Sequence, residues 1–401
     1  MSEIISADCH LDFWYLPGDL FVSEAPASWK ERMPRVENTD SGRAWVHKGK
    51  IIRYVGDVGL GRDNVRFDRV TMSVRLRRKA RTGLYADAVN GVFRPALPEH
   101  RIKDQERDGV GAEVIYGILG LSRRVQDGEA MGVVFRIYND FVMQFRKFNP
   151  DRFAPLACLP NHDPKAGAEE LRRIAKLGLT GAELIASDSV RPIWDRDWDV
   201  VWEAADETGI PISFHNQGQD VRAVNPSDSH YDDNVKVRNA VRQAVSRFGS
   251  AQFLASIIYS GAFDRYPGFR FVLGESSIGW IPFFLQRMDY EYEEEESFHL
   301  RLRLKPSDYF RINGFVTFER DAVGARLMDL LGEDNVMWGS DYPHPDGTWP
   351  DSMHFLEQEL GGLSERVHAR SPTTMQPNYT GSNNCRDRKD LNHGDLYRST
   401  C

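Results

Sequence analysis

Cysteine is scarce in this 401-residue chain, and no two cysteines stand in a Cys-x-x-Cys spacing. The four cysteines are scattered at Cys9, Cys158, Cys385 and Cys401. A disulfide-stapled domain has a much denser pattern, so these thiols do not indicate a disulfide framework. This usage fits a reducing compartment, and we expect a cytoplasmic protein.

Long apolar runs and long basic runs are also lacking. No apolar stretch approaches the ~18 residues that a bilayer requires, and the first residues, MSEIISAD, have neither a basic n-region nor an apolar h-region. We therefore expect no membrane partner. The net charge of −8 argues against a nucleic-acid partner. The short basic segment 75–81 is interpreted as a solvated face or part of a lid.

What the chain does have is a series of short apolar runs, each bounded by turn residues and separated by amphipathic segments. Helical patterns at 163–177 and 198–208 end at Gly178 and Gly209, where glycine tolerates a left-handed backbone. Apolar runs alternating with helices predict a parallel sheet covered on both faces, and eight of them favour a closed (β/α)8 TIM barrel. The eight runs are residues 4–7, 112–117, 153–160, 181–186, 211–215, 270–274, 310–318 and 335–339.

One region breaks the alternation. Residues 16–98 follow the first expected strand and are rich in glycine and charge. An insertion of this length is usually a functional lid or an interaction arm. We therefore expect residues 1–365 to form a single barrel domain with this insertion inside it.

Acids and imidazoles stand at several expected strand ends, where a barrel gathers its chemistry. Asp8 and His10 are spaced i, i+2, so both side chains point to the same side of their strand. His215, Glu275 and Asp341 end three further strands. Each alone could be a cap or a hydrogen-bonded core residue, but together they form oxygen and nitrogen donors suited to a divalent metal.

Other polar and aromatic side chains near the strand ends have two interpretations. His344 follows Asp341 by three residues and could bind substrate or hydrogen-bond a backbone carbonyl. Trp14 and Trp280 could line an aromatic substrate pocket, as could Trp349, although large aromatics near a barrel more often serve packing. Glu183, at another strand end, could simply pair with an arginine.

The segments that carry these residues resemble a known family. They are SADCH, NPDRFAPLACLPNHDPKAGAEELRRIAKLG, WEAADETGIPISFHNQG, GAFDRYPGFRFVLGESSIGWIPFFLQRMD and NVMWGSDYPHPDGTWP. The chain resembles the amidohydrolase-2 group of the amidohydrolase superfamily over most of residues 4–365. The resemblance implies a TIM barrel and one divalent metal, held by Asp8, His10, His215 and Asp341. Zinc is the expected metal; manganese is the alternative, because Asp8 replaces a histidine and makes the site richer in oxygen.

The expected reaction is metal-dependent hydrolysis of a small, aromatic or carboxylated substrate by a metal-activated water. Asp341 would take the water's proton and Glu275 is the second candidate for that shuttle. The alternative is a nonoxidative decarboxylase of an aromatic or unsaturated acid. Glu275 stands where many family members have a histidine, which weakens that alternative, since a carboxylate gives a departing carboxylate no cationic help. A third hypothesis is a binding protein that has lost catalysis.

The end of the chain lacks the sequence pattern expected for the closing helix of a barrel. Residues 366–401 lose the amphipathic pattern, and codons compatible with residues 370–381 also encode KITYDNAAKLYG in another frame. That string resembles the closing helix of the family, so we expect a frameshifted tail.

Residues 277–295 contain an apolar helical segment that could support a homodimer.

Overall fold

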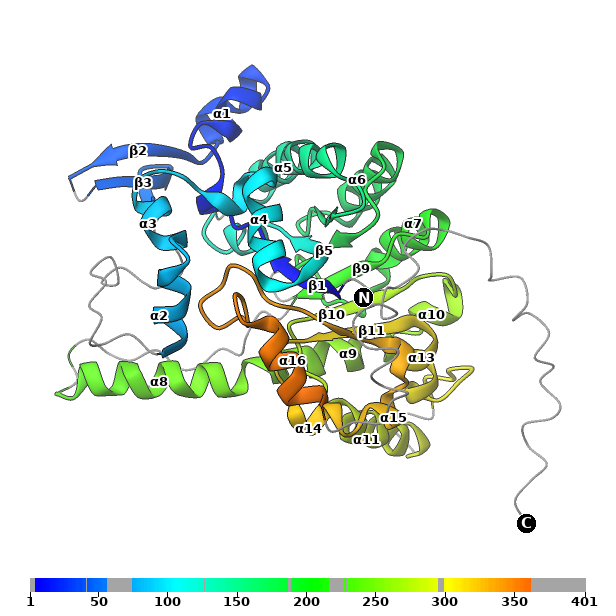
Figure 1. Ribbon diagram of the computed structural model, residues 1–401. Helices are drawn as coiled ribbons and strands as arrows, with labels where there is room; N and C mark the ends of the chain where they lie inside the picture. The colour runs from blue at the N-terminus through cyan, green and yellow to red at the C-terminus, as the bar shows by residue number, and fades with distance from the viewer. Residues whose placement is uncertain are drawn as a thin grey trace, which may run out of the picture.

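The computed structural model describes residues 4–361 apart from 41, 56–73, 126, 187–188, 216–226, 228 and 295–298. Parallel strands form the centre of the molecule and helices surround them (Figure 1). The strands are β1 (Ile4–His10), β5 (Val110–Tyr116), β6 (Phe153–Pro155), β7 (Ala157–Cys158), β8 (Ala182–Glu183), β9 (Ile212–His215), β10 (Phe271–Gly274), β11 (Gly314–Phe318) and β12 (Val336–Trp338).

The strands follow one another in chain order around the centre. One sheet has the order β1-β5-β6, and the other runs from β7 through β8, β9, β10 and β11 to β12. Leu156 separates β6 from β7 and still donates its N–H to Ile115 O at 2.9 Å, so β6 and β7 are two parts of one barrel strand. His10 N donates to Tyr342 O and Asp341 N to Asp8 O at 2.8 Å, which brings the segment after β12 beside β1. The expected TIM barrel is confirmed.

The helices lie between the strands in the chain, and most of them cover the outside of the barrel; α8 instead projects beyond it (Figure 1). Gly178 and Gly209 adopt φ values of +90° and +69° directly after α6 and α7, as the sequence indicated. The helices are α4 (Pro98–Asp108), α5 (Gly128–Phe148), α6 (Pro164–Leu177), α7 (Asp199–Thr208), α8 (Tyr231–Val245), α9 (Gly249–Tyr259), α10 (Ala262–Arg265), α11 (Ile281–Glu293), α13 (Pro306–Asn313), α14 (Ala322–Ala325), α15 (Met328–Leu331) and α16 (Ser352–Leu360).

The seventh expected strand, residues 310–318, begins too early. Residues 310–313 end helix α13, and β11 starts at Gly314. A Cβ at position 314 would lie 2.7 Å from the ring of Phe271 and 2.9 Å from Phe310 O, so this tight helix-to-strand junction needs glycine. The helix and the strand are both apolar and adjacent, which is why the pattern merged them.

The insertion has structure of its own. It contains α1 (Leu20–Glu24), an antiparallel sheet of β2 (Arg35–Thr39), β3 (Gly42–His47) and β4 (Lys50–Tyr54), and the helices α2 (Val74–Arg81) and α3 (Leu84–Val89). Buried insertion side chains such as Phe21 and Trp45 share one apolar cluster with Val134 and Phe135 of α5. The insertion therefore packs against the barrel wall.

The expected frameshifted tail, residues 366–401, lies outside the described residues. Among the described helices, none has both the length and the hydropathy needed to cross a bilayer.

Asp108 clamps the last helix to the barrel and makes stability depend on pH. Its carboxylate accepts hydrogen bonds from Ser352 N at 2.8 Å and Ser352 Oγ at 2.5 Å, at the start of α16. Burial raises the pKa of Asp108 to about 7, although the Ser352 bonds lower it. An unfolded aspartate has a pKa of about 3.9. Between these values the folded protein keeps a proton that the unfolded chain has released, so the free energy of unfolding falls as the pH rises.

We expect Asp108→Asn to flatten this dependence, because an amide does not titrate and can still bond both Ser352 groups. Urea unfolding from pH 4 to pH 7.5 measures it. The wild type should lose stability relative to the variant across that window. Parallel pH profiles for the two proteins would contradict the assignment to Asp108.

Candidate metal centre

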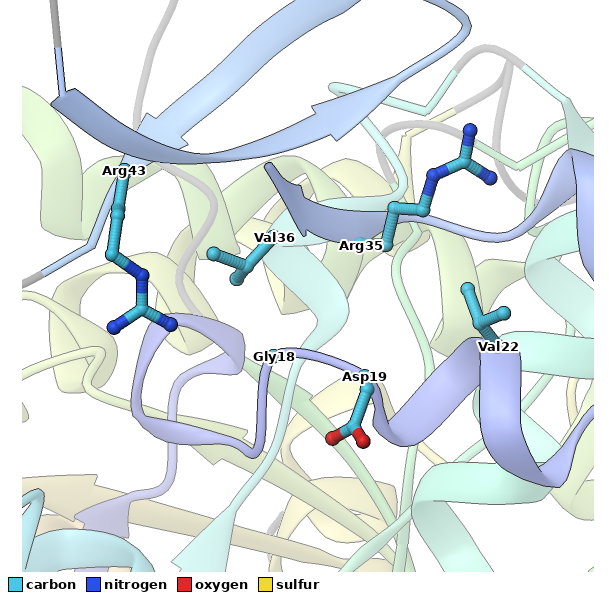
Figure 2. A pocket seen from close by; sticks show the side chains of 6 residues that line it. All are labelled: Gly18, Asp19, Val22, Arg35, Val36 and Arg43. Atoms are coloured by element: carbon cyan, nitrogen blue, oxygen red, sulfur yellow. The ribbon is translucent and has the colours of Figure 1, made fainter. Parts of the chain in front are cut away.

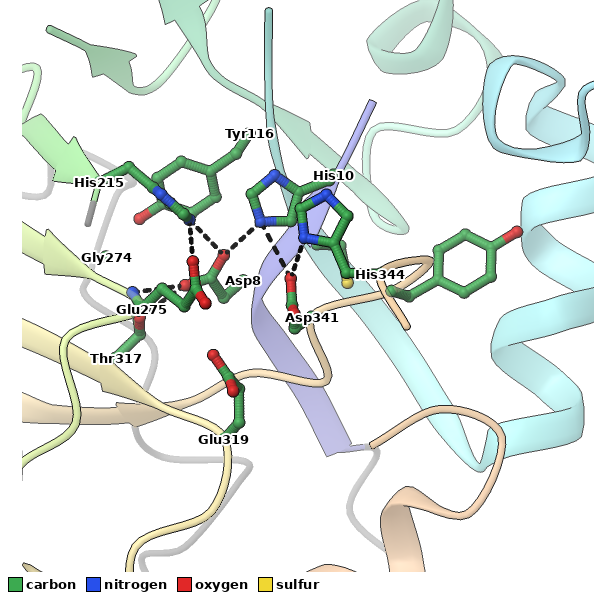
Figure 3. Close-up of polar contacts among 12 residues, drawn as sticks. Asp8, His10, Tyr116, His215, Gly274, Glu275, Thr317, Glu319, Asp341 and His344 are labelled. Atoms are coloured by element: carbon green, nitrogen blue, oxygen red, sulfur yellow. Dashed lines mark hydrogen bonds and ion pairs between the residues drawn. The ribbon is translucent and has the colours of Figure 1, made fainter. Parts of the chain in front are cut away.

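Four of the expected donors meet at the carboxyl ends of the barrel strands (Figure 3). His10 Nε2 lies 3.3 Å from Asp8 Oδ1 and 3.1 Å from Asp341 Oδ1. His215 Nε2 lies 3.6 Å from the same Asp8 oxygen. Asp8 and Asp341 are fully buried, and His10 is 5% exposed. Side chains from β1, β9 and the segment after β12 thus converge on one space, as the sequence predicted.

The orientation of Asp8 is set by the neighbouring strands. Its Oδ2 accepts hydrogen bonds from Glu275 N at 2.9 Å and from Thr317 Oγ1 at 2.7 Å. Its Oδ1 is thereby left facing His10 and His215. Fixing one oxygen of a ligating carboxylate so that the other faces the ion is the usual role of residues behind a metal site. Sequence reasoning missed Thr317, because a threonine inside a strand carries no signal of its own.

The backbone is unusual where two of the acids emerge. Asp341 has φ +54° and Glu275 has φ +49°, in the left-handed region that residues with a Cβ rarely adopt. Such conformations cost of order 1–3 kcal/mol each and cluster at functional sites. The backbone N–H of Asp341, bonded to Asp8 O, helps to hold the turn. The strained turn directs the Asp341 carboxylate back into the barrel mouth.

The donors fit a cation. Asp8 Oδ1, His10 Nε2 and both carboxylate oxygens of Asp341 are buried and make no hydrogen bond of good geometry to any described residue. Although burial alone would raise the pKa of Asp8, contacts with His10 and His215 hold it below its ordinary value. Burial would likewise lower the pKa of His10, but Asp341 and Asp8 raise it to about 9. The cluster therefore stabilises positive charge, which a divalent metal would supply with these two carboxylates and two imidazoles as ligands.

His344 joins the cluster instead of extending freely from it. Its Nδ1 lies 2.8 Å from Asp341 Oδ1, and its Nε2 lies 3.0 Å from Asp12 Oδ2. The ring stacks on His10 with centroids 4.0 Å apart. Both ring nitrogens thus face carboxylates, and a substrate-binding role for His344 stays a prediction.

Glu275 lies beside an arginine that sequence reasoning missed. Glu275 Oε2 is 3.5 Å from His215 Nε2, and Glu275 Oε1 contacts Arg247. Arg247 also bonds Glu319, with its second guanidinium nitrogen 3.1 Å from that carboxylate. In the sequence Arg247 follows no strand, because it lies in the short helix η6 (Ser246–Phe248) between α8 and α9. Only the fold brings this cation to the site.

The remaining candidates have packing partners. The Arg53 guanidinium covers the Trp14 ring at 3.8 Å, and Trp280 Nε1 donates to Ser276 O at 2.8 Å. Glu183 accepts from Gly117 N rather than from an arginine. Substrate contacts of Trp14 and Trp280 stay predictions. Sequence reasoning also missed Tyr116, an aromatic side chain beside the metal centre. The centroid of its ring lies 4.8 Å from that of His215.

The insertion has a hollow of its own. A cavity of about 300 Å³ lies between the start of α1 and strands β2 and β3 (Figure 2). None of the strand-end donors lines it. Its lining consists of Gly18, Asp19, Val22, Arg35, Val36 and Arg43.

Gly339 gives a test of the geometry around Asp8. A Cβ at this position would lie 2.3 Å from Asp8 Cβ and 3.0 Å from Asp8 N. We expect Gly339→Ala to push Asp8 out of place and to weaken binding of Mn²⁺ by about 10- to 100-fold, the usual effect of disturbing a metal ligand's support. Titration calorimetry with Mn²⁺ measures the affinity. Gly120→Ala is the control, because nothing lies within 4 Å of its added Cβ. Equal affinities of both variants would contradict the close approach.

The chain matches the family model described as "Amidohydrolase" over residues 7–370. It therefore belongs to this amidohydrolase family and is an enzyme, which argues against the binding-protein hypothesis. Gamma-resorcylate decarboxylase of Rhodococcus jostii is 28% identical over 246 residues, covering 56% of this chain and 72% of that protein. 2-Amino-3-carboxymuconate-6-semialdehyde decarboxylase of Dictyostelium discoideum is 24% identical over 294 residues, covering 71% and 75%.

Solved structures share the fold. An amidohydrolase from Mycobacterium avium subsp. paratuberculosis superposes with a TM-score of 0.70 at 18% identity, over 93% of this chain and 98% of that chain. A dihydroxybenzoic acid decarboxylase from a Polaromonas species, with bound manganese and the inhibitor 2-nitroresorcinol, gives 0.58 at 20% identity, over 77% and 93%.

These relatives correct the expected reaction. Hydrolysis was favoured because Glu275 offers no positive charge to a departing carboxylate, yet the related enzymes are decarboxylases. The premise that only the strand-end residues determine the charge near Glu275 was incomplete as well. Arg247 places a guanidinium between Glu275 and Glu319, so the charge around Glu275 could not be judged from the strand ends alone.

Proposed function

We propose that this enzyme is a metal-dependent, nonoxidative decarboxylase of an aromatic or unsaturated carboxylic acid. The observation that carries the proposal is the convergence of two carboxylates and two imidazoles, in which buried atoms of Asp8, His10 and Asp341 make no hydrogen bond of good geometry to any described residue. The chain is also related to decarboxylases of such acids. The substrate would be a small molecule that enters at the carboxyl ends of the strands.

Asp8, His10, His215 and Asp341 would hold the metal. Manganese is favoured over zinc, because the donors are rich in oxygen and a decarboxylase of this fold carries manganese. When bound, the metal supplies positive charge to the substrate's carboxylate and a neighbouring oxygen. His344, between Asp12 and Asp341, would keep the Asp341 carboxylate facing the ion.

Glu275 would act as the acid of the reaction. Burial raises the pKa of its carboxyl and the nearby Asp341 charge raises it further, although His215 and Arg247 lower it, so Glu275 can carry a proton to the ring carbon. The carbon–carbon bond then breaks and CO₂ leaves, with the bonding electrons returned to the ring. Arg247, bonded to Glu275 and Glu319, would hold Glu275 in place and offset negative charge near the leaving carboxylate.

The insertion, residues 16–98, would act as a lid within a single domain of residues 1–365. Helix α2 supports this role, because buried Lys79 donates to the carbonyl of His344 and Arg78 lies 3.1 Å from Asp351. Both contacts join the insertion to the segment that carries Asp341. The tail, residues 366–401, would add nothing to catalysis if it is frameshifted.

The test is release of CO₂ from gamma-resorcylate, from other hydroxybenzoates and from aminocarboxymuconate semialdehyde. Protein loaded with Mn²⁺ should release CO₂ and form the decarboxylated product in equal amounts, and protein stripped with a chelator should not. The metal content, measured by elemental mass spectrometry, should be about one ion per chain. Protein that holds its metal but releases no CO₂ from any of these acids would contradict the proposal.

A further inference from the structure

Tyr116, the last residue of β5, packs against both imidazoles of the candidate metal centre (Figure 3). The centroid of its ring lies 5.7 Å from that of His10, and the two ring planes are tilted by 31°. The same ring meets the His215 ring edge-on, with centroids 4.8 Å apart and planes at 64°. The Tyr116 side chain is buried. One aromatic ring therefore contacts two of the four proposed ligands.

The hydroxyl of Tyr116 reaches a different strand. Its oxygen lies 2.6 Å from Ser213 Oγ in a hydrogen bond between two buried side chains. Ser213 precedes His215 by two residues on β9, so both side chains leave this strand on the same side. The hydrogen bond therefore holds the part of β9 that carries a ligand.

The Tyr116–Ser213 contact joins two strands that are not neighbours in the barrel. Strand β5 pairs with β1 and β6, whereas β9 pairs with β8 and β10. On the β1 side, Tyr116 is the register partner of His10, and its carbonyl accepts a hydrogen bond from Leu11 N at 2.8 Å. Tyr116 thus connects the strand end of His10 to the strand of His215 across the inside of the barrel.

Gly274 on β10 leaves the space that this contact needs. It is the register partner of His215. A Cβ at position 274 would lie 2.8 Å from the Tyr116 hydroxyl oxygen, 3.0 Å from Tyr116 Cζ and 3.1 Å from His215 Cδ2. A side chain at this position would therefore push the phenol and the imidazole out of place. The absence of a side chain here allows the phenol to lie against His215.

We propose that Tyr116 is a positioning residue of the metal centre, which holds His10 and His215 in the orientation that binds the ion. The inference rests on the proposed ligand set and concerns metal binding rather than the reaction. An imidazole already held in its ligating orientation loses less conformational entropy when the ion binds. The hydrogen bond to Ser213 fixes the phenol, so the phenol in turn limits the movement of both imidazoles.

Tyr116→Phe tests the proposal, because it keeps the ring and removes only the hydroxyl. We expect titration calorimetry to show Mn²⁺ binding weakened by roughly 10-fold, and by roughly 100-fold in Tyr116→Leu, which also loses the ring. The EPR spectrum of bound Mn²⁺ should change in both variants, since it responds to the geometry of the ligands and not to the stability of the fold. Tyr138→Phe is the matched control. Tyr138 of α5 is completely buried, and its hydroxyl makes no hydrogen bond to any described residue.

A second variant separates positioning from folding. Tyr116→Phe leaves the buried Ser213 hydroxyl without this hydrogen bond, which costs stability. Adding Ser213→Ala removes the stranded hydroxyl, so urea unfolding should show the double variant to be more stable than Tyr116→Phe alone. Its Mn²⁺ affinity should stay low, because the contact between β5 and β9 is still missing.

Recovery of affinity together with stability would make Tyr116 a packing residue and overturn the proposal. Wild-type affinity and an unchanged EPR spectrum in Tyr116→Phe would overturn it too. A wild-type protein that binds no Mn²⁺ would overturn the proposed ligand set and this inference together. Because none of these readouts depends on CO₂ release, a failure of the proposed decarboxylation would be seen separately.

Discussion

Protein carrying Asp341→Asn is expected to be purified without its metal and to lose decarboxylation by roughly 10³-fold or more. Asp341 Oδ1 lies 3.1 Å from His10 Nε2 and 2.8 Å from His344 Nδ1, at full burial. Burial alone would raise the pKa of Asp341, but His344 and His10 hold it well below the ordinary value, so the side chain is a carboxylate at any working pH. Asparagine keeps the shape and removes the charge. The loss would therefore report on charge at the ion rather than on packing.

Metal content by elemental mass spectrometry and CO₂ release from gamma-resorcylate measure the two effects. Asp329→Asn is the matched control, because Asp329 is an exposed acid of α15 that takes part in none of the contacts described at the metal centre. That control should keep its metal and its rate. If Asp341→Asn kept both, Asp341 would be a structural acid and the proposed metal set would be wrong.

The donors on the strands could be predicted because the sequence signal for each lies within a few residues of the donor. The i, i+2 spacing places Asp8 and His10 on one side of β1 whatever else the chain does, and His215 ends an apolar run just as plainly. Arg247 and Glu319 could not be found in this way. Arg247 lies in a 3-10 turn between two helices, and its only distinguishing feature is the pair of carboxylates that the fold places against it. Because Arg247 was not recognised, Glu275 was taken without its cationic partner, and hydrolysis was preferred to decarboxylation.

The fold shows the same division between local and distant causes. Gly178 and Gly209 end their helices as expected, since the signal and its effect are one residue apart. The sheet of the insertion was not predicted. Trp45 on β3 is completely buried against residues that include Phe21 and Phe135, the latter from α5 far along the chain. From Ala44 to His47 the strand is buried on both faces, so its sequence has no period-2 alternation that would indicate a strand.

The largest effect on stability is expected from Arg101→Met. Arg101 is completely buried, with its Nε 2.5 Å from Glu113 Oε1 and a second nitrogen 3.0 Å from Oε2. It also donates to His10 O at 2.8 Å and to Pro95 O at 3.0 Å. Methionine preserves much of the length but leaves the Glu113 carboxylate buried without its cation. Breaking a buried pair in this way costs roughly 3–5 kcal/mol, a large part of the stability of most domains.

Urea unfolding would measure this loss, and a double variant separates its causes. In Arg101→Met combined with Glu113→Gln no charge is left stranded, so the double variant should be more stable than Arg101→Met alone. Arg172→Met is the control, since Arg172 and Glu207 form an exposed pair at 2.7 Å that should matter far less.

Because Arg101 holds the carbonyl of His10, its loss should also loosen the end of β1. Mn²⁺ binding should therefore weaken in Arg101→Met and stay weak in the double variant, even where stability returns. Recovery of metal affinity together with stability would instead mean that the Arg101–Glu113 charge pair matters to the metal site only through folding. The two readouts thus distinguish a residue that maintains the barrel from one that also positions a metal ligand.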